Sequence, residues 1–83
     1  MLNENQRAHL DAVVRALDDD LFVESVTLDS HDNLELVLCR EFVCFRPLLI
    51  STGEVDVAAA LQGNLIAQQT LGKHLRSKLE GWL

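Results

Sequence analysis

The last third of the chain, residues 51–83, carries apolar residues at the spacing of one long amphipathic helix. At ~100° per residue these side chains fall along one side of the helix, and the pattern continues across Gly63 and Gly72. A helix over 54–82 would be ~43 Å long, whereas a compact chain of this length is only roughly 30 Å across. The helix must therefore bend at a glycine or extend its apolar face to another chain. This apolar side consists of Val57, Leu61, Leu65, Leu75, Leu79, Trp82 and Leu83.

Two residues at the centre of this apolar side are unsuited to ordinary core packing. Gln68 is polar, and Gly72 in a helix interior costs ~1 kcal/mol relative to alanine. A second helix crossing closely at Gly72 would offset that cost, and Gln68 would then bond across the crossing, as buried polar residues do in coiled coils. The alternative is a kink at Gly72 that leaves Gln68 in solvent. We expect Ser51 to be the N-cap of this helix, with Glu54 as its capping-box partner.

A first helix is predicted near the start of the chain. Asn3 is its expected N-cap, because Gln6 three residues later completes a capping-box pattern. The helix ends at three consecutive carboxylates, which oppose the helix dipole and form a candidate acidic patch: Asp18, Asp19 and Asp20. Its apolar face follows the i, i+3, i+4, i+7 rule and consists of Leu10, Val13, Val14, Leu17 and Leu21.

Between the two helices the sequence has strand character. Residues 21–29 are rich in β-branched and aromatic side chains, and 30–33 have the short polar side chains of a turn. A second strand begins at Leu34. The sequence therefore predicts an α+β fold, a small single domain over 1–83 with the order α-β-β-(β)-α, an antiparallel sheet and a long C-terminal amphipathic helix.

The end of the second strand has two interpretations. It continues over 34–45 as one long strand, bent or bulged, or it bends at Arg40–Glu41 so that 43–50 becomes a third strand. Neither Arg40 nor Glu41 suits a tight hairpin turn, which favours the long strand. Pro47 lacks a ladder donor and ends the regular strand or marks an edge.

The long strand is apolar on both faces, so both faces need cover. Two helices in this order usually pack on one face, which leaves the other for a second subunit; in the alternative, the helices cover opposite faces. The chain is 48% apolar, more than a small core can hide, and symmetric dimers are the commonest oligomers. We therefore expect a homodimer. The candidate interface residues are Val37, Val43, Phe45, Leu65, Gln68, Gly72, Leu75, Leu79 and Trp82.

The two cysteines are expected to be free, buried thiols. On one continuous strand Cys39 and Cys44 point to opposite faces, ~16 Å apart, which is too far for a disulfide. Met1-Leu2-Asn3-Glu4 is not a secretory leader, so we expect a reducing cytoplasm. Two cysteines also cannot complete a zinc site.

Charge and motif content exclude most other function classes. The net charge is −6, made up of −8 in residues 1–60 and +2 in 61–83, which argues against binding to nucleic acid or membranes. The three histidines match no ligand spacing, and Gly72-Lys73 lacks the rest of a phosphate-binding loop. We therefore expect no catalytic residue, metal or cofactor. The basic residues after Gly72 are expected to complement the helix end and to pair with Asp18–Asp20.

The order of elements is similar to that of double-stranded-RNA-binding domains. The start of the second helix reads Glu54-Val55-Asp56, however, where those domains carry lysines. In composition and helix placement, the chain resembles bacterial type III secretion chaperones. The excess of apolar surface on the long helix and on the long strand predicts a non-enzymatic cytoplasmic protein that dimerises and binds an unidentified protein. The alternatives are an acidic mimic of nucleic acid that inhibits a DNA- or RNA-binding protein, and an uncharacterised small enzyme.

Overall fold

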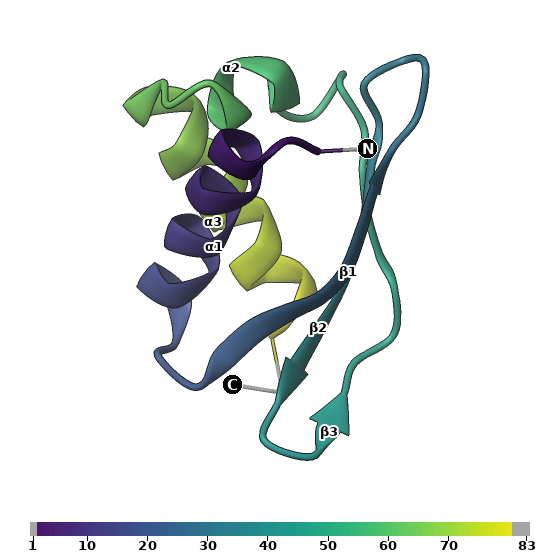
Figure 1. Ribbon diagram of the computed structural model, residues 1–83, viewed down its shortest axis with the longest axis vertical. Coiled ribbons are helices and arrows are strands. Elements are labelled where there is room, and N and C mark those ends of the chain that lie inside the picture. Colours follow the sequence, from purple (N-terminus) through teal and green to yellow (C-terminus); the bar gives the residue numbers. More distant parts are fainter. Residues whose placement is uncertain (1, 81–83) are drawn as a thin grey trace.

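The helices and the sheet form two layers, with the helices gathered on one face of a small antiparallel sheet (Figure 1). The computed structural model describes residues 2–80. The elements follow in the order α1 (Glu4–Leu17), β1 (Leu21–Leu28), β2 (Leu34–Arg40), β3 (Val43–Cys44), β4 (Leu48–Ile50), α2 (Val57–Leu61) and α3 (Leu65–Lys78). This arrangement confirms the α+β class and the predicted order. The alternative in which the helices cover opposite faces is wrong.

Helix α1 begins and ends where the sequence predicts. The Asn3 side chain accepts from the Gln6 backbone N–H at 2.8 Å, and the Gln6 side chain accepts from the Asn3 backbone N–H at 3.0 Å. At the other end, the Asp18 carboxylate accepts from the Asp20 N–H at 2.9 Å and pairs with Arg40 of β2 at 3.5 Å. Asp18 therefore ties the end of α1 to the sheet, which gives one carboxylate of the acidic run a structural role.

Strand β2 lies at the centre of the sheet. It pairs antiparallel with β1 on one side, where the register shifts by one residue at Glu24, and with β3 and β4 on the other. β3 and β4 pair with opposite ends of β2 and are separated by a segment that includes Pro47. The core-facing side chains of β2, which alternate along the strand, are Leu34, Leu36 and Leu38.

The predicted long strand is wrong, because the chain turns sharply after Arg40. Arg40 pairs with Val43, so Glu41 and Phe42 form a two-residue hairpin loop. Glu41 has φ of 56°, a left-handed conformation that is uncommon for a residue with a side chain. The sequence carries no glycine or asparagine that would mark this turn. The alternative with a third strand is the one found, divided into β3 and β4.

The turn between β1 and β2 has the predicted polar chemistry. Asp29 accepts from the backbone N–H of His31 at 2.8 Å and of Asn33 at 2.9 Å. These two hydrogen bonds to the charged form lower the pKa of the Asp29 carboxyl below its ordinary value. Asp32 takes the left-handed conformation with φ of 62°, as short polar residues in turns do.

The predicted long C-terminal helix is in fact two helices separated at Gly63. Gly63 has φ of 100°, which ends α2, and the Asn64 side chain caps α3 by accepting from the Ala67 N–H at 3.0 Å. Helix α2 is capped by Asp56, whose carboxylate accepts from the Ala59 N–H at 3.1 Å. The predicted N-cap at Ser51 is therefore wrong. The bend turns the apolar sides of both helices toward one core, and the longest extent of the described fold is 30 Å.

Candidate interaction surfaces

Several predicted interface residues belong instead to the core of the single chain. Phe45, Leu75 and Leu79 are buried, because the bend at Gly63 lays α3 over the sheet and the hairpin turns Phe45 inward. These three assignments are corrected. Trp82 lies outside the described residues.

Four other candidate residues lie at or near the surface. Val43 and Leu65 are exposed, and Val37 is half-buried on the sheet. Gln68 is half-buried and donates from Nε2 to the Ala60 carbonyl oxygen at 3.1 Å, so its amide holds α2 against α3.

Gly72 lies where α1 and α3 cross. A Cβ built on Gly72 would lie 3.8 Å from Cγ1 of Val13 and 3.9 Å from Cδ2 of Leu17, both at ordinary van der Waals distance. A helix therefore does cross at Gly72, but it is α1 of the same chain. No kink is found there, because α3 runs through from Leu65 to Lys78.

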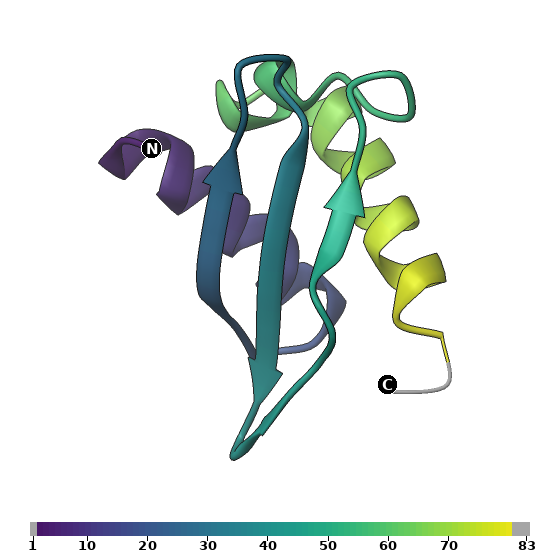
Figure 2. The ribbon, with the colours of Figure 1, turned by 90° about the vertical axis from the view of Figure 1, so that its right-hand side faces the viewer.

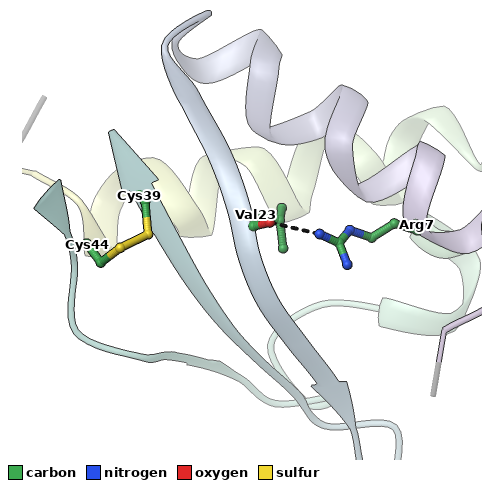
Figure 3. Close-up of a disulfide and its surroundings, with 4 residues drawn as sticks. All are labelled: Arg7, Val23, Cys39 and Cys44. Atoms are coloured by element: carbon green, nitrogen blue, oxygen red, sulfur yellow. Dashed lines mark hydrogen bonds between the residues drawn. A yellow bond between two sulfur atoms is a disulfide. The ribbon is translucent and has the colours of Figure 1, made fainter. Parts of the chain in front are cut away.

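The cysteines form a disulfide, which corrects the prediction of free thiols. Cys39 of β2 and Cys44 of β3 are cross-strand neighbours with their Cα atoms 3.9 Å apart (Figure 3). The hairpin at Glu41–Phe42 brings them together, whereas a continuous strand would have kept them on opposite faces. The Phe45 N–H donates to the Leu38 carbonyl at 2.9 Å directly beyond the disulfide.

The face of the sheet away from the helices is open and carries apolar side chains together with Ser25, Thr27 and Glu35. In Figure 2 this face is toward the viewer, with the helices behind it. Phe22 pairs across the strands with Cys39, which itself pairs with Cys44, so these three form one row across the sheet. Phe22 is 44% exposed and Leu49 of β4 is 64% exposed. We call this surface the open-face patch; it consists of Phe22, Val37, Leu49 and the Cys39–Cys44 disulfide.

The open-face patch was missed from the sequence except for Val37. The signal was present, because Phe22 lies between the buried residues Leu21 and Val23, and successive residues of a strand point to opposite faces. Leu49 lies between Leu48 and Ile50 in the same way. Alternation alone would therefore have placed both side chains away from the core.

The free edge of β1 is protected against pairing with another strand. The register shift at Glu24 bulges the strand, and Nη2 of Arg7 donates to the Val23 carbonyl oxygen at 2.8 Å (Figure 3). Bulges and bound carbonyls are ways in which proteins block edge-to-edge association. Strand β1 is therefore a poor edge for pairing with a strand of another chain.

A second surface is a groove between α1 and α3, in the helical layer. It encloses about 410 Å³ and is lined by apolar and amide side chains together with two cations. Within residues 2–80, neither Lys73 nor Arg76 makes an ion pair, and no carboxylate lines the groove. We call this surface the α1–α3 groove; its lining residues are Ala12, Val13, Ala16, Leu17, Leu65, Gln68, Gln69, Gly72, Lys73 and Arg76.

The predicted pairing between the basic C-terminal cluster and the acidic run is not found over 2–80. Asp18 pairs with Arg40, and Lys78 lies 4.0 Å from Glu54. Asp19 and Asp20 are exposed. Arg40 of the sheet therefore partly neutralises the acidic patch, Lys78 lies beside Glu54, and Lys73 and Arg76 of α3 line the groove.

The part of the chain that the structure describes holds no group of three or more His, Cys, Asp or Glu side chains placed to bind a metal ion. Among the same residues no helix is long and apolar enough to cross a bilayer. Comparison with family models, with curated proteins and with solved structures finds no match for this chain.

Proposed function

We propose that this protein acts without catalysis, by binding other proteins, and that it works as a homodimer joined through the open-face patch. The observation that carries the proposal is the position of all the described helices on one face of the sheet (Figure 2), which leaves Phe22 and Leu49 exposed on the other. Clustered exposed apolar side chains are typical of interaction sites.

A second copy of the chain fits this surface well. In a two-fold dimer the same patch meets itself, so Phe22 and Leu49 of one copy would be covered by the apolar side chains of the other. Two sheets pack ~10 Å apart when their facing side chains interdigitate. Ser25 and Thr27 are also on this face and carry no charge, so their burial costs less than that of an ion. Glu35, which pairs with Thr27 and Leu49, is the charged residue of these rows, and its carboxylate opposes the association.

The disulfide supports the same role. Cys39 is completely buried although it faces away from the helices, because Phe22 and Cys44 flank it in the cross-strand row. The covalent link holds β3 against β2 and so keeps the apolar row in one geometry. A preorganised surface loses less conformational entropy on association than a mobile one.

The test compares the apolar side chains of the open-face patch with an exposed apolar side chain of the helical layer. Sedimentation velocity over a concentration series should show a dimer for the unaltered protein and a monomer for Phe22→Asp combined with Leu49→Asp. Leu65→Asp is the matched control, because Leu65 is 72% exposed on the helical side and its replacement should leave the dimer intact. Circular dichroism verifies that each variant is folded.

Three outcomes would contradict the proposal. These are a monomer at every concentration of the unaltered protein, a folded double variant that still dimerises, and equal loss of the dimer in the Leu65→Asp control.

A further inference from the structure

We propose that the α1–α3 groove binds an amphipathic helix of a partner protein, and that this helix carries acidic side chains beside its apolar face. The groove lies in the helical layer, across the core from the open-face patch, so this proposal is independent of dimerisation. The shape of the groove, its small lining residues and its charge each point to such an occupant.

The groove lining contains three small residues. Ala12 and Ala16 of α1 are exposed and lie one turn apart in the lining, while Gly72 of α3 lies against Val13 and Leu17 of α1. Small residues at a helix contact let a further helix approach to ~8 Å between axes. The exposed alanines of α1 beside the crossing at Gly72 therefore leave room for a third helix along the groove.

The length of the groove sets the length of the occupant. The lining residues of α3 run from Leu65 to Arg76, which is ~16 Å of helix at ~1.5 Å per residue, or about three turns. Leu65 is exposed at one end and Leu17 is half-buried on the α1 side. An amphipathic helix with apolar residues at i, i+4 and i+7 would cover this span, as in other helix-in-groove complexes.

Charge identifies the kind of helix. The charged side chains that line the groove are Lys73 and Arg76, and over residues 2–80 neither has a carboxylate partner, although the whole chain has a net charge of −6. A helix with glutamates next to its apolar side would complement these cations. An anionic membrane fits less well, since a concave groove with two cations gives little attraction against an acidic body.

The binding test uses two designed peptides of roughly 14 residues with the same leucine pattern. One carries glutamate beside the leucines and the other carries lysine at the same positions. Fluorescence anisotropy should show that the glutamate peptide binds more tightly, by roughly tenfold, as expected for two charge pairs. Net charge alone predicts the reverse order, because an acidic protein attracts the lysine peptide.

A charge reversal in the protein provides the control. Lys73→Glu combined with Arg76→Glu should exchange the preference, so that the lysine peptide becomes the tighter ligand. Ala16→Arg should block both peptides by filling the groove. Lys78→Glu is the matched variant outside the groove lining and should preserve the preference for the glutamate peptide.

The location of binding is read from amide chemical shifts. The glutamate peptide should shift the amides of Ala12, Ala16 and Gly72, while those of Phe22 and Leu49 stay unchanged. The proposal is wrong if the lysine peptide is preferred, if the two peptides bind equally, or if the charge-reversed protein keeps the original preference. It is also wrong if vesicles containing anionic lipid bind the protein while the glutamate peptide does not.

Discussion

At the scale of single residues, two glycines of the C-terminal helical region, Gly63 and Gly72, have opposite roles. The sequence leaves open a bend at a glycine, and the bend is at Gly63, whose φ of 100° ends α2; a Cβ there would lie 3.1 Å from Cε1 of His9. For Gly72 the sequence predicts either a crossing helix or a kink; α1 does cross there, but a Cβ would meet its neighbours no closer than 3.8 Å. Apolar periodicity could not separate them, because the spacing of the leucines is unaffected by either.

Substitution of alanine at both positions tests this difference. Gly63→Ala should destabilise the protein by about 1–2 kcal/mol, because alanine resists a left-handed backbone and its Cβ would press on His9. Gly72→Ala should stabilise it by about 0.5–1 kcal/mol, since alanine fits and favours the helix. Urea unfolding measures both. Equal destabilisation by the two substitutions would contradict this prediction, because it would show that the contact between α1 and α3 has no room for a Cβ at position 72.

At the scale of elements, the helix and strand boundaries marked by capping or turn residues were predictable. The hairpin that depends on one residue in an unfavourable backbone conformation was not. The capping box of Asn3 predicted the start of α1, and the turn at 30–33 predicted the end of β1 and the start of β2. The hairpin between β2 and β3 depends on Glu41 in a left-handed conformation, for which glutamate carries no sequence signal. Because the long strand was favoured over the bend at Arg40–Glu41, Cys39 and Cys44 were placed on opposite faces and the disulfide was excluded.

The hairpin also gives an element-scale prediction about the disulfide. A link that closes so short a loop stabilises a protein by about 2 kcal/mol in the chain-entropy treatment. Reduction should therefore lower the urea midpoint and should release β3, while β1, β2 and β4 keep their pairing. A thiol assay on the folded and on the unfolded protein, without reductant, should detect no free thiol. The double variant Cys39→Ala, Cys44→Ala is the control, because reductant should not change its stability; free thiols in the unaltered protein would contradict the pairing.

At the scale of the whole molecule, apolar and charged side chains are divided between two layers. The sheet layer exposes an apolar face in an acidic body, and the helical layer exposes a groove with Lys73 and Arg76. The sequence indicated both the excess of apolar surface and the basic C-terminal part. It could not show that they lie on opposite layers, because that separation depends on the bend at Gly63 and on both helical elements packing on one face of the sheet.

This division predicts opposite responses of the two contacts to salt. Two copies that meet through the open-face patch each carry a net charge of −6, so they repel at low salt, and Glu35 on the same face adds like charge nearby. Raising the salt from about 0.01 M to about 0.15 M shortens the screening length from ~30 Å to ~8 Å. The dimer should therefore become severalfold tighter in sedimentation experiments, because its apolar attraction remains while the repulsion is screened.

Binding of the glutamate peptide in the α1–α3 groove should weaken over the same range, since its preference depends on attraction to Lys73 and Arg76. The charge variants separate the two effects. Glu35→Gln should tighten the dimer at low salt and leave peptide binding unchanged, because Glu35 lies on the sheet and not in the groove. If the dimer instead becomes weaker as salt is added, attraction between charges, and not the apolar face, is the main cause of self-association.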